Sequence, residues 1–516
     1  MKKIALFRKN IHARVYSPLF CLLTLAFLLG TASLAWGQIP SYPDYPTQAE
    51  LEDMDEWDGT SVNGQYKISS DMEISSTVII QNTTLYLYPV GNPTITKKVL
   101  GSEIGVDKAK LFYLYETGKL FIIGNESNKL NIYGNCGNGT VANPTPIPTS
   151  TTYQGAAIYA RNGSPEIWLK HVEFYGFITH TEMSNGGVQG DSHGGIVTMG
   201  HHSFATTTNG VCNMDHVTFK NSYGGPINTN SNQGFGRIIS LVNGTWTVTL
   251  DNVTIHDCII SEKLRGNHYS IGGMGSVIRS QGNVGGALTM RNCVAHHNTY
   301  RDLSARSSIL NYTTMDEINA QQLAGQGGVV NWRSGKQVDG NTQVTIQDCN
   351  FYNNSARCGG AVATCATINM VRTNIHDNEA VLGGGVYFYT YNGTDKLYNG
   401  RGFEAIFGDG VNIYNNSAKE YGGAAYMTFD ASDDVGFDAD KNPMSPHFQV
   451  QINTGCDVYG NKAPKGSGFA IIDGCPYSHY NNLTIIKNGH WNTGAPSPLT
   501  AVKSMIIMPK APRATQ

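Results

Sequence analysis

Charged side chains are scarce in this 516-residue sequence, because Asp, Glu, Lys and Arg together make up only 15% of it. Soluble proteins usually carry about a quarter. The shortage excludes a coiled coil or other long-helix protein, which would be rich in Glu and Lys. Hydrophobic residues make up 40% of the chain, which is enough to bury a core and excludes a disordered chain.

Long apolar runs are also scarce. Residues 1–37 contain basic residues, then the apolar run Leu19–Leu29, then Ala35-Trp36-Gly37, which is the order of a secretory signal peptide. The run is too short to cross a bilayer core of about 30 Å, and no later segment has the length of a membrane span. We therefore expect a protein exported through the inner membrane, with no transmembrane anchor of its own.

Positive charge is not in excess either. Removing the five basic residues of the signal peptide from 36 Lys and Arg leaves 31, against 39 Asp and Glu, so the net charge changes from −3 to −8. Nucleic-acid binding depends on clustered Lys and Arg. The charge balance therefore argues against a nucleic-acid partner.

Glycine, in contrast, is abundant, with 59 residues, and the chain contains a repeated four-residue signature. The signature is an apolar residue, a ring or other side chain, a turn residue and usually Asn. Its clearest copies are Ile132-Tyr133-Gly134-Asn135, Phe351-Tyr352-Asn353-Asn354, Ile375-His376-Asp377-Asn378, Ile413-Tyr414-Asn415-Asn416 and Val458-Tyr459-Gly460-Asn461. Looser copies start at Phe174, Phe219, Ile255, Ala295 and Ile485.

A glycine pair followed by small or β-branched residues recurs between these copies. The pairs start at Gly194, Gly327, Gly359, Gly384 and Gly422. A further apolar or small residue stands two positions before each signature, and strand alternation places it on the same side as the first signature position. Both rows should therefore line the interior, where Cys293, Cys349 and Cys456 would be small buried hydrophobes.

The shortest spacing between copies, from Phe351 to Ile375, is too short for a propeller blade of about 40 residues. A coil of this length must bury its apolar face on its neighbours, so the pattern predicts an all-β parallel β-helix of about ten coils. The Asn residues would then lie about 4.8 Å apart, close enough for an amide ladder. We expect a lead-in or linker over 38–65, the β-helix over 66–490, a tail over 491–516, and insertions at 299–324, 391–410 and 427–450.

The paired motifs Phe351-x-x-Asn354 and Gly359-Gly360-Ala361-Val362 resemble those of the chlamydial polymorphic outer-membrane proteins. The resemblance is most specific over Phe351–Tyr426. It implies a right-handed parallel β-helix on, or released from, a bacterial surface, with an adhesive role. The sequence departs from the autotransporter relatives because the proline-rich residues after Asn488 leave no room for a membrane barrel. This departure puts surface attachment in doubt and leaves association with other surface proteins as one possibility.

The second signature position should point outward and forms the candidate binding row. Its ring residues are Tyr133, Tyr175, His256, His296, Tyr352, His376, Tyr414 and Tyr459, with Lys220 at one coil. Rings about 4.8 Å apart can form a platform for sugars or for a protein partner. The alternative, that the rings stack on one another and simply stabilise the coils, is favoured.

Metal ligands and a disulfide are weaker hypotheses. The insertion containing Asp430, Asp433, Asp434 and Asp438 has calcium-like spacing but lacks the turn Gly and the closing Glu, so a solvated loop is favoured and no cofactor is predicted. The pairs His201-His202 and His296-His297 cannot chelate from a strand without a turn. Cys358 with Cys365 is the disulfide that the spacing favours.

Two function classes follow. The first is a non-catalytic, exported adhesin-like protein that binds an extracellular glycan or a host cell-surface component. The alternative is a polysaccharide lyase or glycoside hydrolase, for which the carboxylate pairs Asp348 with Asp377 and Asp215 with Asp251 lie on neighbouring coils. Acidic corners are common in such arrays, and no catalytic residue is assigned.

Overall fold

The computed structural model describes part of the chain. The described residues are 40–98, 110–134, 156–179, 195–200, 209–224, 234–235, 237–263, 276–302, 327–332, 343–364, 366–389, 403–429, 448–452, 455–473, 483–487 and 506–509. Contacts divide the chain into Met1–Ser41 and Tyr42–Gln516, and the fold below is that of the second unit.

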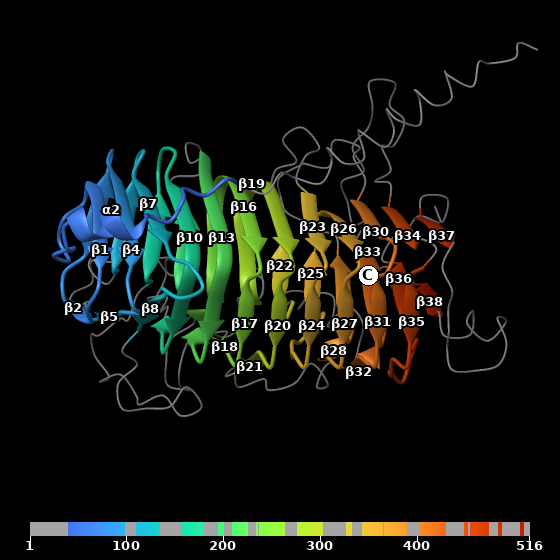
Figure 1. The fold of residues 1–516 in the computed structure, drawn as a ribbon. Coiled ribbons are helices and arrows are strands. Elements are labelled where there is room, and N and C mark those ends of the chain that lie inside the picture. The colour runs from blue at the N-terminus through green and yellow to red at the C-terminus, as the bar shows by residue number, and fades with distance from the viewer. Residues whose placement is uncertain are drawn as a thin grey trace, which may run out of the picture. The chain divides into compact units, whose positions relative to one another are not determined.

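This unit is nearly all β, and its main strands form three columns in which coils follow one another in chain order (Figure 1). The first column contains β1 (Gly64–Ile68), β4 (Thr84–Pro89), β7 (Lys119–Ile123), β10 (Glu166–Tyr175), β13 (Asn209–Lys220), β16 (Arg237–Asp251), β19 (Ser276–Arg291), β23 (Gln343–Gln347), β26 (Thr367–Val371), β30 (Phe403–Phe407), β34 (Phe448–Ile452) and β37 (Leu483–Lys487). The second column continues β10 and β13 and adds β2 (Met72–Ile74), β5 (Thr94–Lys97), β8 (Leu130–Tyr133), β17 (Thr254–His256), β20 (Val294–His296), β24 (Asn350–Tyr352), β27 (Asn374–His376), β31 (Asn412–Tyr414) and β35 (Asp457–Tyr459). The third column shares β16 and β19 and adds β3 (Val78–Gln81), β6 (Phe112–Tyr115), β9 (Ile158–Arg161), β12 (Val197–Gly200), β22 (Val330–Trp332), β25 (Val362–Thr364), β29 (Val386–Tyr389), β33 (Ala425–Phe429), β36 (Phe469–Asp473) and β38 (Ile506–Pro509).

Short strands at the corners complete the described strands. They are β11 (Ile178–Thr179), β14 (Tyr223–Gly224), β15 (Gly234–Phe235), β18 (Ile259–Lys263), β21 (Thr299–Asp302), β28 (Glu379–Leu382) and β32 (Ser417–Tyr421). Among the strands that the structure describes, every pairing is parallel except that of β15 with β18. The result is a solenoid-like stack of parallel strands.

The signature copies stack in register in the second column. Phe351 pairs with Ala295 on one side and with Ile375 on the other. These apolar positions are at most 1% exposed, and the row two residues earlier is buried as well, as the alternation predicts. The core therefore lies inside the three columns.

The structure removes one of the predicted signature copies and adds two others. The copy at Ile485 is wrong, because Ile485 pairs with Val450 in the first column. Two further copies exist, since Ile95 pairs with Ile132 and Met72 pairs with Ile95. They were missed because neither is followed by a ring or by Asn.

The glycine-pair corner is also shifted by one residue in one coil. The first glycines of the aligned pairs have left-handed backbone angles at Gly327, Gly359, Gly383 and Gly422, so the pair predicted at Gly384 begins at Gly383. The second glycines lie against the next coil: a Cβ on Gly360 would stand 2.2 Å from the carbonyl oxygen of Gly384. Only glycine allows the backbones to approach this closely.

Residues 42–65 pack on the first coils. Trp57 is 1% exposed, belongs to the main core and stacks on Phe112 at 5.9 Å. The short helix α2 (Gln48–Asp53) begins with a capping box formed by Thr47 and Glu50. The lead-in is therefore part of the packed unit, and Tyr42 meets the outward ring of Trp168 edge-on at 5.3 Å.

Candidate functional site

The candidate site, here called the ring strip, is the outward surface of β17, β20, β24, β27, β31 and β35. Each of these strands has three residues, and the central one points into the core. Because neighbouring residues of a strand face opposite sides, the first and third residues face outward. The third residues are His256, His296, Tyr352, His376, Tyr414 and Tyr459.

These six rings form one continuous stack. The ring centroids of successive residues are 4.6–5.1 Å apart, and the planes of all five pairs lie within 14° of parallel. The spacing follows the distance between paired strands. Each inner ring therefore has both faces covered by its neighbours and presents its edge outward, while Tyr459 at one end is 39% exposed.

The two other predicted ring residues form a separate pair. Tyr133 stacks on Tyr175 at 5.1 Å. Lys220 occupies the next coil, where its ammonium pairs with Glu173 at 2.5 Å and lies 5.8 Å from the Tyr175 ring. Lys220 thus separates this pair from the six-ring stack.

The turn after each ring is left-handed and carries polar side chains. Asp257, His297, Asn353, Asp377 and Asn415 have φ between 53° and 55°. The left-handed angle falls on the turn residue and not on the Asn that follows it. Such turns favour Asn, Asp and Gly.

Three of these turn residues, Asp257, His297 and Asp377, contact the rings of their own coils. Asp377 contacts Nδ1 of His376 at 2.7 Å, and Asn350 contacts Nε2 of the same ring at 3.0 Å. In the neighbouring part of the strip, Nδ1 of His296 lies 2.7 Å from Nδ1 of His297. The left-handed turn supplies the geometry that a continuous strand cannot, so both rings of this pair face the same side.

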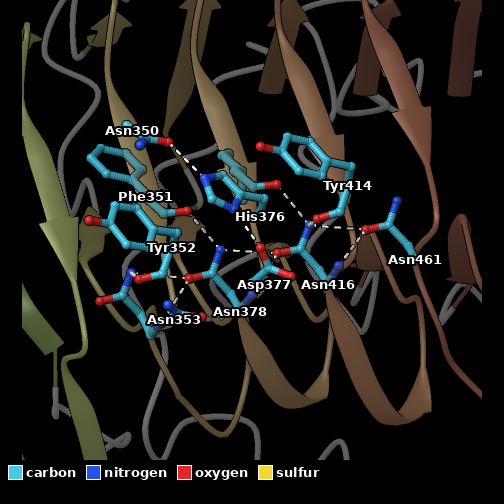
Figure 2. Close-up of polar contacts among 12 residues, drawn as sticks. Asn350, Phe351, Tyr352, Asn353, His376, Asp377, Asn378, Tyr414, Asn416 and Asn461 are labelled. Carbon is cyan, nitrogen blue, oxygen red and sulfur yellow. Dashed lines mark hydrogen bonds and ion pairs between the residues drawn. The ribbon is translucent and has the colours of Figure 1, made fainter.

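The Asn after the turn points inward and forms a buried amide ladder below the strip. Figure 2 shows Asn378, Asn416 and Asn461 in a row, with the rings of Tyr352, His376 and Tyr414 above them. Side-chain N–H groups donate along the ladder at 2.9–3.0 Å from Asn298 through Asn461. The predicted ladder is confirmed, and it holds the turns that carry the rings.

A second outward column lies beside the rings. Its residues are Thr254, Val294, Asn350, Asn374, Asn412 and Asp457. The side chain of Asn412 donates to that of Asn374 at 2.9 Å. Sequence reasoning missed this column, although an Asn stands immediately before the signature copies at Ile132, Phe351, Ile375 and Ile413 and signals it.

The strip lacks basic aliphatic side chains in the part described. Its six strands and the turns that follow contain Asp257, Asp377 and Asp457, but neither Lys nor Arg. Hydroxyl, imidazole and amide groups therefore line it together with carboxylates. Such a surface can hydrogen-bond to a polar, uncharged ligand, and its carboxylates repel an anionic one.

The carboxylate pairs proposed for catalysis have other partners. Asp215 and Asp251 are in register, but Asn252 donates to Asp215 at 3.1 Å and Asn292 donates to Asp251 at 3.0 Å. These hydrogen bonds link side chains at the corners of neighbouring coils, which is a structural role.

The other proposed pair is not brought together at one corner. Asp348 precedes its signature strand, whereas Asp377 follows β27. Arg372 binds Asp348 at 2.6 and 2.8 Å and holds the pKa of that carboxyl below its ordinary value. Asp377 contacts His376 instead.

His171 lies at the same type of corner as Asp348. It is 6% exposed, has a left-handed φ of 53°, and its ring stacks on that of His216 at 4.6 Å. Burial, followed by the nearby His216, lowers the pKa of His171 from 6.5 to about 4. The folded protein therefore resists a proton that the unfolded chain accepts.

Stability is accordingly expected to fall as the pH decreases from 6.5 towards 4, by about 3 kcal/mol for His171 alone. The variant His171→Asn retains a side chain suited to the left-handed turn and should show a flatter profile. Denaturant unfolding across this pH range checks the prediction. Parallel profiles for the two proteins would contradict it.

Several predicted residues lie outside the described residues. These are Asp430, Asp433, Asp434, Asp438, His201, His202 and Cys365. Cys358, the predicted partner of Cys365, is buried and recorded as a thiol. Within the described ranges, no group of three or more His, Cys, Asp or Glu is arranged for a metal, and no helix has the length and apolarity of a membrane span.

No protein-family model matches the chain, and no curated protein matches its sequence.

Proposed function

We propose that this chain is an exported bacterial protein, built as a right-handed parallel β-helix, that binds an uncharged extracellular glycan without cleaving it. The glycan would be free or part of a host or other cell surface. The proposal includes a relationship to the chlamydial polymorphic outer-membrane proteins, supported by the motifs at Phe351 and Gly359. It places the protein either at the cell surface, in association with other surface proteins, or outside the cell as a secreted protein.

The continuous ring strip is the observation that carries this proposal. An extended polymer lying along the stack meets a ring edge and an outward polar group at nearly every coil, at the same spacing each time. Hydroxyl groups of a sugar can donate to and accept from the Tyr hydroxyls and the Asn amides. Because the ring faces cover one another, hydrogen bonding at the edges replaces face stacking as the proposed mode of recognition.

A triple variant separates binding from stability. Changing Tyr352, Tyr414 and Tyr459 to Phe removes three edge hydroxyls and keeps the stacked rings. We expect affinity for a neutral polysaccharide to fall at least about tenfold, since each hydrogen bond contributes about 0.5–1.5 kcal/mol. The melting temperature should not change. Glycan-array binding followed by titration calorimetry measures both the ligand and the loss.

The matched control is the double change Tyr133→Phe and Tyr175→Phe, which removes the same groups from rings outside the six-ring stack. It should leave binding intact. Equal losses in the two variants, or no binding to any neutral glycan, would contradict the proposal. Release of reducing ends or unsaturated uronates would instead establish the lyase or hydrolase alternative.

A further inference from the structure

Two inward cysteines lie next to each other beneath the ring strip. Val294 pairs with Asn350, which places Cys293 and Cys349 at equivalent positions of consecutive coils. The backbone N–H of Asn350 donates to the carbonyl oxygen of Cys293 at 2.9 Å. Each cysteine is 1% exposed; the Cys293 thiol donates to the carbonyl oxygen of Arg291 at 3.2 Å, and the Cys349 thiol donates to that of Gln347 at 3.1 Å, so both side chains are oriented alike.

The two cysteines precede β20 and β24, which are separated by more residues than any other two consecutive strands of the second column. The register separates Ala295 from Phe351 by 56 residues, whereas Phe351 and Ile375 are 24 residues apart. The entropic cost of closing a loop rises with its length. A covalent link is therefore expected to stabilise the fold most at this coil.

We propose that Cys293 and Cys349 form a disulfide in the exported protein and so fasten these two coils together. Equivalent residues of paired parallel strands lie about 4.8 Å apart, within the range of about 4.4–6.8 Å between the Cα atoms of bridged cysteines. The two thiols lose two protons and two electrons to a disulfide oxidant such as oxidised glutathione, which becomes two glutathione thiols. The bond would fix His296 against Tyr352 in the strip. This inference rests on the proposed export and not on glycan binding.

The bond must form before the coil closes. Burial raises the pKa of the Cys349 thiol well above its ordinary value, so little thiolate is present in the folded chain. Oxidant present during refolding should therefore produce the disulfide, whereas the same oxidant added to the folded, reduced protein should act far more slowly.

Peptide mapping of the full chain tests the proposal. The chain is refolded with reduced and oxidised glutathione, alkylated in denaturant without reduction, digested and analysed by mass spectrometry. We expect a linked peptide pair containing Cys293 and Cys349, lighter by two hydrogen atoms than the separate peptides. Full alkylation of both cysteines, or a link from either one to a different cysteine, would overturn the proposal.

A stability measurement provides the second test. Reduction should lower the Tm of the wild-type protein by about 4 °C and should leave that of Cys293→Ser unchanged. Cys456→Ser is the matched control, because Cys456 occupies the same inward row with Val411 before it; this variant should keep the full response to reduction. Thr373 at 0% exposure shows that the row accepts a hydroxyl. An unchanged Tm on reduction of the wild type would also overturn the proposal, whatever the glycan-binding result.

Discussion

Replacing Asn378 with Ala is expected to lower the free energy of unfolding by about 4 kcal/mol. The side chain is 1% exposed. It accepts two hydrogen bonds from Asn354 and donates one each to Phe351 O and Asn416 Oδ1, all at 2.9–3.0 Å. The substitution removes all four bonds in a place that water does not reach, which explains the large effect.

Asn374→Ala is the control for this prediction, because Asn374 lies in the same coil but faces outward. Its side-chain oxygen accepts one hydrogen bond, from Asn412 at 2.9 Å, and water can replace that bond. We expect a loss below about 1 kcal/mol. Denaturant unfolding of both variants compares the two amides directly, and similar losses would show that the buried ladder has no special role in stability.

Gly360→Ala should destabilise the protein by at least about 4 kcal/mol. The added methyl group would lie 2.2 Å from the carbonyl oxygen of Gly384 and 2.8 Å from Cβ of Asn378. The first of these atoms belongs to the backbone, so two coils must move apart. Hydrogen exchange should therefore rise in β25 and β29 more than in distant coils, because each coil contacts mainly its neighbours.

Gly91→Ala is the corresponding control. Gly91 has φ of 74°, and a Cβ built there meets no heavy atom within 4 Å. This variant tests backbone strain without the collision and should cost about 1 kcal/mol. A Gly360→Ala protein as stable as Gly91→Ala would show that the coils accommodate the methyl group.

Sequence alternation was sufficient to predict the interior and the outward rings. Phe351 and Tyr352 differ by one position, and a strand must place them on opposite sides. The signature did not identify coils that have the same backbone geometry but different residues. Thr96 follows Ile95 where other coils have a ring, so this copy was missed, and Trp57 enters the core from a segment read as a possible linker.

The orientation of the rings could not be predicted from the sequence. Whether Tyr352 offers its face or its edge depends on the position of His376 relative to it, and this requires the register and the side-chain torsions. The structure fixes the separation of the two rings at 5.1 Å and their angle at 4°. This result changes the expected contact with a ligand from the ring face to the ring edge.

The uneven coil lengths have a consequence for how this protein can vary. The chain uses 56 residues to pass from Ala295 to Phe351 and 24 to pass from Phe351 to Ile375, yet the ring spacings over these two steps are 4.9 and 5.1 Å. The periodicity of the surface is therefore independent of the periodicity of the sequence. Loops can lengthen, shorten or be exchanged between coils while the rings keep their spacing. Selection can therefore alter the residues around a bound ligand without altering the spacing of the rings that the ligand contacts.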